Sequence, residues 1–157
     1  MKRVNLNLLT AMLVILFVTS FSSCKKDSST EPETEKITFT VDGTQYETSN
    51  IQGADAGFGL MIVGSLTSEQ RALSILFDYD GISTGTYTFG DANYSINWDV
   101  FITTTEIDRY TARSGSITID EYNAETGKIK GTFNAVCKTL NDSRTVTITN
   151  GSFIVYE

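Results

Sequence analysis

The chain has 157 residues, of which 19 are acidic and 12 are basic, giving a formal net charge of −7. A chain this acidic is not expected to bind nucleic acid, because phosphate binding needs clustered positive charge. It contains no histidine, so Ser-His and Cys-His catalytic pairs and histidine-ligated zinc are excluded within the chain, and we expect no cofactor.

The first 23 residues have the layout of a bacterial export signal. Lys2 and Arg3 precede an apolar run at 8–18, and small polar residues then lead to Cys24. The apolar run is shorter than the ~20 residues that a transmembrane helix needs, so we do not expect it to persist as an anchor. Removing residues 1–23 from the 157 leaves 134, with 10 basic and 19 acidic side chains and a net charge of −9.

The run Phe21-Ser22-Ser23-Cys24 resembles the lipobox of bacterial lipoproteins, with Phe21 in place of the usual leucine. The resemblance implies that the Cys24 thiol receives a diacylglyceryl group and that Cys24 becomes the mature N-terminus. An ordinary secretory signal with a chance cysteine is the alternative. Because each buried methylene contributes ~0.8 kcal/mol, two or more acyl chains hold a protein stably. We therefore predict lipid attachment at Cys24 and a membrane tether.

Residues 24–35 are predicted to be a flexible linker. The stretch after Cys24 contains the only proline of the chain and no aromatic or branched aliphatic residue. A flexible coil of this length spans about 18 Å on average, so the domain is not pressed onto the membrane. Lys25-Lys26-Asp27 is similar in part to export tags of some Bacteroidetes lipoproteins. We expect an outer-membrane location and leave periplasmic and surface-facing orientations open.

Residues 36–157 are predicted to form a single all-β domain. Apolar and polar residues alternate with period two, which is typical of half-buried strands. The expected strands lie at 36–41, 45–48, 58–66, 72–78, 94–102, 117–119, 128–139 and 145–156. The strand at 58–66 is apolar throughout, which favours a central strand covered on both faces. No helix longer than two turns is expected, although 104–113 could hold a short turn.

Two segments between strands carry weak signals of ligand binding. The glycines of 50–57 could suggest a phosphate cradle, but no Lys-Ser or Lys-Thr follows, so we predict a loop. The run Asp78-Tyr79-Asp80-Gly81 has carboxylates two residues apart, as calcium loops do, but it lacks their later ligands. We interpret it as a turn capped by side chains and predict no metal site.

The strand at 94–102 carries the candidate binding residues. Trp98 falls among its apolar residues and is predicted to be in the core. The opposite face is a polar row with one aromatic residue, and such a row could offer hydrogen bonds and a stacking ring to a sugar. Asn97, Asp99 and Phe101 are therefore candidate ligand-binding residues. The alternative is a phenylalanine covered by a loop or a neighbouring sheet edge.

The last two predicted strands contain two further features. Cys137 shares the phase of Ile129 and Phe133, so we expect a buried thiol without a disulfide partner. In 145–156 the apolar positions change from even to odd across Asn150-Gly151. A β-bulge explains this change of phase, because two residues of the strand then oppose one residue of the partner strand. We expect Gly151 to adopt the left-handed backbone conformation of such a bulge. A two-residue hairpin is the alternative.

Four motifs in predicted strands and turns are similar to one family. They read Gly-Thr-Tyr-Thr-Phe-Gly at 85–90, Gly-Ser-Ile-Thr-Ile at 115–119, Gly-Lys-Ile-Lys-Gly-Thr-Phe at 127–133 and Ile-Thr-Asn-Gly-Ser-Phe at 148–153. They resemble small Bacteroidetes lipoproteins classed as a domain of unknown function. The resemblance extends over most of 36–156. It implies a compartment and a fold, and it carries no activity.

These patterns predict an antiparallel β-sandwich or a flattened up-and-down β-barrel of about nine strands, behind a signal and a flexible linker. We expect a membrane-tethered, non-catalytic module that binds a glycan or another ligand. The alternatives are a structural or accessory subunit of an outer-membrane assembly and a carboxylate-based hydrolase. The acidic residues that a hydrolase could use fall in predicted turns or on outer faces, at Asp78, Asp80, Asp99, Asp108, Asp120 and Glu121.

Overall fold

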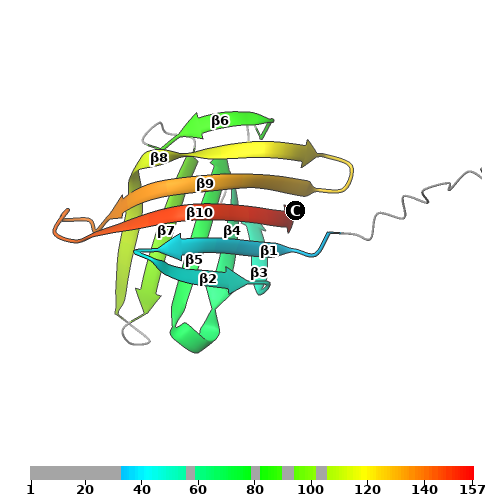
Figure 1. Cartoon of the computed structure of the whole chain (residues 1–157). Coiled ribbons are helices and arrows are strands. Elements are labelled where there is room, and N and C mark those ends of the chain that lie inside the picture. The colour runs from blue at the N-terminus through cyan, green and yellow to red at the C-terminus, as the bar shows by residue number, and fades with distance from the viewer. Residues whose placement is uncertain (1–32, 56–58, 79–81, 90–93, 102–105) are drawn as a thin grey trace, which may run out of the picture. The chain divides into compact units, whose positions relative to one another are not determined.

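Ten antiparallel strands form one continuous sheet that curls into a nearly closed barrel (Figure 1). The computed structural model describes residues 33–55, 59–78, 82–89, 94–101 and 106–157. The strands are β1 (Lys36–Val41), β2 (Thr44–Thr48), β3 (Ile51–Asp55), β4 (Gly59–Leu66), β5 (Arg71–Asp78), β6 (Gly85–Thr88), β7 (Tyr94–Phe101), β8 (Ile107–Asn123), β9 (Lys128–Lys138) and β10 (Thr145–Tyr156). The predicted all-β class is confirmed.

Helical structure in these residue ranges is limited to one short turn. It is the 3-10 helix η1 (Thr67–Glu69), which connects β4 to β5. Nowhere in the described part of the chain is there a helix with the length and apolar character needed to cross a membrane. The strands, joined mostly by short turns, therefore build the fold.

The order of strands in the sheet is β2-β1-β10-β9-β8-β7-β5-β4-β3, with β6 paired to β8. The two ends of this path, β2 and β3, are consecutive in the chain. Thr48 at the end of β2 donates a hydrogen bond of 2.7 Å from its hydroxyl to the carbonyl of Ser65 in β4, so the ends of the sheet meet. Strands β1, β2, β9 and β10 run across β4, β5 and β7, which gives a flattened barrel of two layers (Figure 1).

β8 is the strand that connects the two layers. Its first half pairs with β7 and its second half pairs with β6, while most of its length pairs with β9. The register against β9 shifts between Ala112 and Ser114, which lets the strand bend. Gly115 follows the shift with φ of 115°, and a Cβ there would lie 2.2 Å from the carbonyl oxygen of Asn134. Only glycine fits this position.

Three local predictions are wrong. Residues 51–55 form the edge strand β3 where a loop was expected, and 107–113 belong to β8 where a short turn was considered. In both segments, pairing with a neighbouring strand outweighs the weak local signal. β4 lies next to the edge strand, and Met61 and Val63 on its outer face are only half-buried. Residues 56–57 and 79–81 of the predicted turns lie outside the described ranges.

The core lies between the two layers and is rich in aromatic rings. Trp98 is 2% exposed, and its ring centroid lies 5.4 Å from that of Phe39 and 5.2 Å from that of Tyr46. The Arg71 guanidinium lies over both the Tyr46 and the Trp98 rings and donates a hydrogen bond to the Tyr46 hydroxyl. Arg71 therefore caps one end of the core by cation–π contact. The predicted core position of Trp98 is confirmed.

Cys137 is also part of the core. It is fully buried on β9, opposite Ala112 of β8 and Val146 of β10. Burial raises the pKa of the Cys137 thiol to about 12, because the thiolate would lose its hydration. The prediction of a buried thiol is confirmed, and its chemistry is that of an apolar packing residue.

The predicted bulge lies in β10. The register against β9 shifts between Ile148 and Gly151, so Thr149 and Asn150 together oppose one residue, and the phase slip is explained. The left-handed residue is Asn150, with φ of 52°, whereas Gly151 was expected to be left-handed. Asparagine tolerates this conformation better than most residues. Glycine is needed at 151 for another reason, since a Cβ there would lie 2.5 Å from the Phe133 ring.

Replacement of Gly151 by valine should lower the free energy of unfolding by ~1–3 kcal/mol, because the new side chain overlaps the Phe133 ring. Ser152→Val is the matched control. Its side chain lies on the outer face, and loss of its hydrogen bond to Thr38 should cost at most ~1 kcal/mol. Denaturant unfolding of both variants measures the difference. Equal costs at the two positions would contradict the packing that we describe.

Candidate functional site

Asn97, Asp99 and Phe101, the residues predicted to bind a ligand, lie along β7, and two of them are already bonded within the sheet. The Thr111 hydroxyl of β8 donates a hydrogen bond of 2.8 Å to Asn97. Asp99 is 4% exposed and accepts two hydrogen bonds, of 2.8 and 2.9 Å, from Arg109 on β8. Asp99 lies on the face of β7 opposite to Trp98, where the arginine of the neighbouring strand covers it.

Phe101 has a different environment from the other two predicted residues. It is half-buried and lines a groove of about 470 Å³ at the end of β4, β5 and β7. The neighbouring Arg71 in this groove is engaged with the core rings, and Gln70 accepts a backbone hydrogen bond from Phe101. The structure does not bring the three predicted residues together around one open site. Their role in ligand binding stays a prediction.

The opposite layer carries a polar surface that the sequence analysis missed. Five hydroxyl residues stand in direct cross-strand register, namely Thr38 of β1, Ser152 of β10, Thr132 of β9, Thr118 of β8 and Thr86 of β6. A second row lies two residues further along each strand and consists of Thr40, Thr149 with Asn150, Asn134, Ser116 and Thr88. We call these two rows the hydroxyl face.

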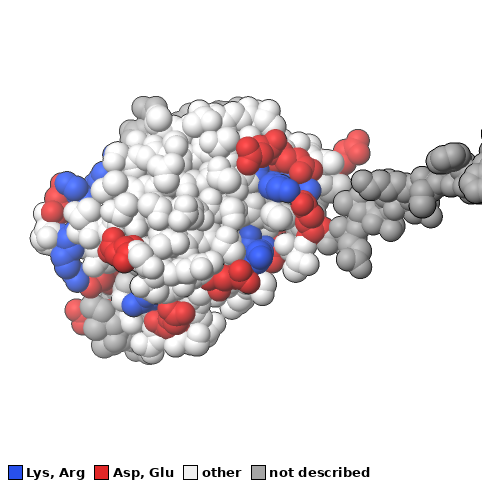
Figure 2. Space-filling model, in the orientation of Figure 1, with Lys and Arg blue, Asp and Glu red and all other residues white. Residues whose placement is uncertain are grey.

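The hydroxyl face contains no charged side chain in either row, although the chain has 31 charged residues. Figure 2 shows an uncharged centre on this side of the molecule, with lysine, arginine, aspartate and glutamate gathered toward its margins. Neighbouring strands are ~4.8 Å apart, and alternate residues on one strand are ~6.7 Å apart. The rows therefore form a regular array of neutral donors and acceptors.

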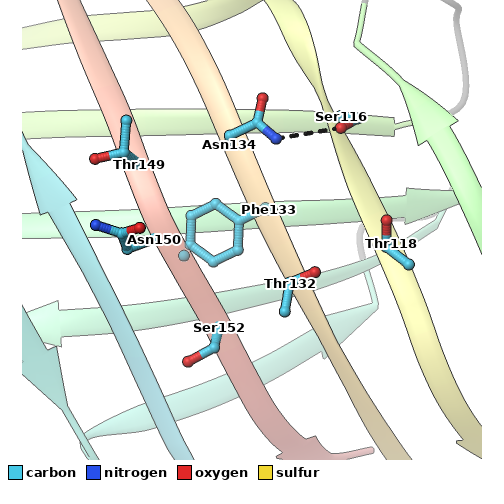
Figure 3. Close-up of a pocket in the computed structure, with 9 residues that line it drawn as sticks. Ser116, Thr118, Thr132, Phe133, Asn134, Thr149, Asn150 and Ser152 are labelled. Atoms are coloured by element: carbon cyan, nitrogen blue, oxygen red, sulfur yellow. Dashed lines mark hydrogen bonds between the residues drawn. The ribbon is translucent and has the colours of Figure 1, made fainter.

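A hollow of about 520 Å³ lies between the two rows on β8, β9 and β10 (Figure 3). Its polar lining consists of Ser116, Thr118, Thr132, Asn134, Thr149, Asn150 and Ser152. Phe133 and Gly151 complete the lining. The volume lies in the range of ~300–1,000 Å³ that is usual for small-ligand sites. The bulge in β10 adds the Asn150 side chain to the lining of the hollow. The same bulge keeps the apolar side chains of β10 on the core side, so it serves both faces of the strand.

The centre of the hydroxyl face has free hydrogen-bonding capacity. Toward the two sides, Thr38 pairs with Ser152 at 2.7 Å and Thr86 pairs with Thr118 at 2.9 Å. The Asn134 amide donates a longer hydrogen bond of 3.3 Å to Ser116 (Figure 3).

Within the described ranges, Thr132, Thr149 and Asn150 make no side-chain hydrogen bond. All three are exposed. A hydroxyl offers one donor and two acceptor positions, and an amide offers two of each. These three side chains can therefore bind a polar ligand without giving up a partner.

Residues 33–35, which we call the strap, lie at one margin of the hydroxyl face. Glu33 forms ion pairs with Lys128 at 2.6 Å and with Lys130 at 2.8 Å, and these bonds lower the pKa of Glu33 to about 2. Glu35 accepts a hydrogen bond of 2.9 Å from the backbone of Tyr156. Glu33 and Glu35, at the end of the predicted linker, are thus bound to the sheet. Residues 24–32 lie outside the described ranges.

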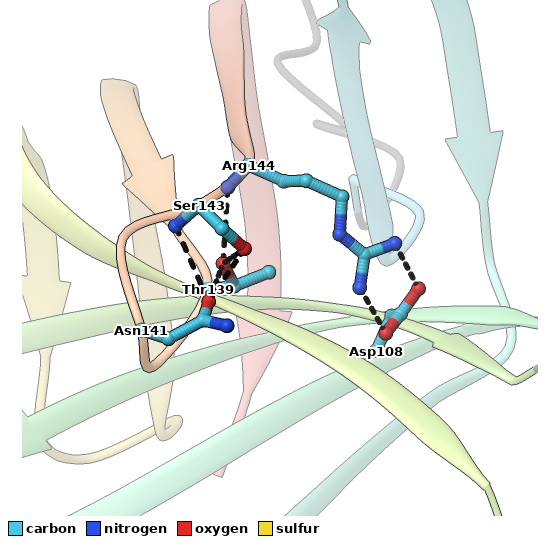
Figure 4. A network of polar contacts seen from close by, with 5 residues as sticks. All are labelled: Asp108, Thr139, Asn141, Ser143 and Arg144. Carbon is cyan, nitrogen blue, oxygen red and sulfur yellow. Dashed lines mark hydrogen bonds and ion pairs between the residues drawn. The ribbon is translucent and has the colours of Figure 1, made fainter.

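The opposite margin is the turn between β9 and β10, where a polar network surrounds Asn141 (Figure 4). Its side-chain oxygen accepts hydrogen bonds from the Thr139 hydroxyl at 2.9 Å and from the Ser143 backbone at 3.2 Å. Arg144 next to this turn donates two hydrogen bonds to Asp108, which lower the pKa of Asp108 and raise the pKa of Arg144. The network orders the turn that carries Leu140.

Leu140 and Ile107 are the large apolar side chains that are exposed in the described part of the chain, at 94% and 44%. Both line a groove of about 640 Å³ together with Arg109, Arg113 and Arg144. Three of the five arginines of the chain thus gather at this margin. An arginine-rich groove with exposed apolar side chains is suited to a protein partner.

Several acidic side chains of β7 and β8 are paired with basic residues. Asp99 pairs with Arg109, and Glu121 bonds to Lys128 at 2.9 Å. Among the described residues, no group of three or more cysteine, aspartate or glutamate side chains could hold a metal ion. What the hydroxyl face offers is neutral hydrogen bonding, which supports binding and orientation of a ligand.

A comparison with protein families matches residues 29–155 to a domain of unknown function, DUF6252. The chain belongs to the DUF6252 family. The matched range includes the strap and most of β10, so the hydroxyl face lies entirely within the DUF6252 domain. A search of curated proteins found no match, and neither did a search of solved structures.

Glu33→Gln should destabilise the chain near neutral pH, because it removes the charge that both lysines share. A carboxyl group whose pKa is depressed by folding stabilises the fold above its unfolded value of 4.5, and this contribution is lost as the pH falls toward 2. The gap in thermal midpoint between the native chain and Glu33→Gln should be constant above pH 4.5 and shrink below it.

Glu125→Gln, in the exposed turn between β8 and β9, is the control and should show no such gap. Melting curves followed by circular dichroism across this pH range test the prediction. A gap that is independent of pH would mean that Glu33 contributes through packing instead of charge.

Proposed function

We propose that this DUF6252 protein is a non-catalytic module that binds a neutral glycan and is tethered to the outer membrane of a Bacteroidetes cell through lipid on Cys24. The observation that carries the glycan-binding function is the hydroxyl face, with its two uncharged rows across five strands. The lipobox resemblance at residues 21–24 supports the tether.

The chemistry of the hydroxyl face fits a glycan better than other ligands. Sugar hydroxyls donate and accept hydrogen bonds, as the threonine, serine and asparagine side chains of the two rows do. Neutral groups also avoid the high cost of desolvating a charge when the ligand covers them. The rows lack the arginine and aromatic anchors that concentrate binding energy at protein interfaces. The net charge of −7 disfavours anionic polymers.

The strap supports the proposed arrangement at the membrane. Cys24 precedes Glu33 by nine residues, and the pairs of Glu33 with Lys128 and Lys130 hold it beside the start of β9. Nine extended residues reach at most ~32 Å. The domain thus stays near the lipid surface, while the turn that carries Leu140 lies at the other end of β9, which is 11 residues long.

Binding of a panel of neutral polysaccharides, both α- and β-linked, tests the proposed function on the full chain in detergent micelles. The double variant Thr132→Val, Thr149→Val keeps side-chain shape and removes two free hydroxyls. Each lost hydrogen bond costs ~0.5–1.5 kcal/mol, so retention on the bound polysaccharide should weaken about tenfold or more. Leu140→Asn, at the far margin, is the control and should bind normally. Absence of binding to every polysaccharide would reject the function.

A second candidate function is a subunit of an envelope assembly, which the exposed Leu140 and Ile107 favour. Aromatic, arginine and large apolar side chains are typical of such contacts. This function predicts the opposite pattern of effects. Leu140→Asn would then abolish association with the envelope partner, whereas the Thr132→Val, Thr149→Val chain would retain it.

Lipid attachment at Cys24 is tested by metabolic labelling with a fatty acid. Cys24→Ser removes the thiol that would carry the diacylglyceryl group, so labelling should be lost and the precursor should stay uncleaved. Cys137→Ser is the matched control, because Cys137 is buried in the core, and labelling should persist. Incorporation of label into the Cys24→Ser chain would contradict the tether.

A further inference from the structure

We infer that the ligand of the hydroxyl face is an extended, β-linked neutral oligosaccharide of about four or more sugars, which lies across the strands with one edge on each row. This inference rests on the proposed function and specifies its ligand. It follows from the direction, length and separation of the two rows.

The length of the rows exceeds that of the hollow. Each row crosses β1, β10, β9, β8 and β6, and four strand spacings of ~4.8 Å give ~19 Å. In an extended β-linked pyranose chain, each sugar advances by about one strand spacing. A chain that follows the rows therefore presents successive sugars to successive strands. A ligand confined to the hollow would leave both ends of the rows unused.

The separation of the rows fits a flat ribbon. An extended β-linked chain carries hydroxyl groups along both edges, and the two rows are ~6.7 Å apart, which is two residues along a strand. One edge can then meet the row that contains Thr132, while the other meets the row that contains Asn134. An α-1,4-linked chain coils, so its hydroxyl groups rotate away from two straight lines. The geometry thus favours β-linked chains.

The central part of the rows provides the main contacts. Thr132, Thr149 and Asn150 are free to donate and accept, and Asn134 faces the bulge from β9. Figure 3 shows these side chains surrounding the hollow. Hydroxyl pairs such as Thr38–Ser152 and Thr86–Thr118 retain unused acceptor positions, so the outer parts of the rows add weaker contacts.

The margins set the direction of the ligand. Along the strands, the array ends at a charged row that includes Lys36 and Lys130, and the strap adds Glu33. In the other direction, the next row has the apolar Val136 of β9 between Ser114 of β8 and Thr147 of β10. Two adjoining rows of neutral hydroxyl and amide groups therefore cross the sheet without interruption, whereas the rows on either side of them contain charged or apolar side chains. A linear polymer gains most contacts when it runs across the strands.

Isothermal titration of the full chain in detergent micelles tests the inference. The probes are β-1,4-linked glucose, mannose and xylose oligomers of increasing length, with α-1,4-linked glucose oligomers as controls. For at least one β-linked series, affinity should rise with each sugar up to about four and then level off, since the rows span four strand spacings. The α-linked oligomers should bind at least tenfold more weakly.

Variants along one row locate the ligand. Thr38→Val and Thr86→Val alter the two ends of the first row and should weaken only the longer oligomers, whereas Thr132→Val at the centre should weaken all lengths. Thr145→Val is the matched control, because Thr145 is exposed on β10 but lies outside both rows, and it should have no effect.

The outcomes separate this inference from the proposed function. If no neutral glycan binds, both are rejected. If glycans bind with an affinity independent of length, or if the end variants act on short and long oligomers alike, the extended placement is overturned while glycan binding stands. Tighter binding of the α-linked series would likewise overturn the assignment of linkage.

Discussion

The bend of β8 at Gly115 is the constraint on which the rest of the structure depends. β8 pairs with β7 before the bend and with β6 after it, so one long strand belongs to both layers. A Cβ at 115 would lie 2.2 Å from a backbone oxygen of β9, and the φ of 115° suits glycine alone. Without the bend the sheet would stay open, and the rings around Trp98 would face water. The bend therefore permits burial of the apolar surface, which drives folding.

The two layers use their polar residues differently. On β7 the polar side chains Asn97 and Asp99 are hydrogen-bonded to the neighbouring strand β8, through Thr111 and Arg109. On the hydroxyl face Asn134 bonds to Ser116, but Thr132 and Thr149 have no side-chain hydrogen bond within the described ranges and stay available. A buried charge must be paired, whereas an exposed hydroxyl can exchange water for a ligand at little cost. The surface that we propose binds a ligand is thus the one whose polar groups the fold does not need.

The charged residues are arranged so that the centre stays neutral. At one end the strap brings Glu33 onto Lys128 and Lys130, and at the other Arg144 joins β10 to Asp108 of β8. The first set ties the strap to the start of β9, and the second ties Arg144, next to β10, to the start of β8. The strap lies at one end of β9 and the exposed Leu140 at the other. The neutral hydroxyl face therefore lies between two charged margins.

Local alternation of apolar and polar residues determined most of the strands, the core positions of Trp98 and Cys137 and the change of phase near Asn150, because a period of two can be recognised within each segment. It did not identify the edge strand β3 or the first half of β8. Only the tertiary structure decided which strands are neighbours. Thr38 and Ser152 hydrogen-bond across 114 residues of sequence, and the two rows exist only because five distant segments share one register. The pairing of Asp99 with Arg109 likewise depends on a neighbouring strand that periodicity does not specify. Strand pairing is a long-range choice made by backbone hydrogen bonds and burial, and this is why the sequence predicted a β fold and missed its hydroxyl face.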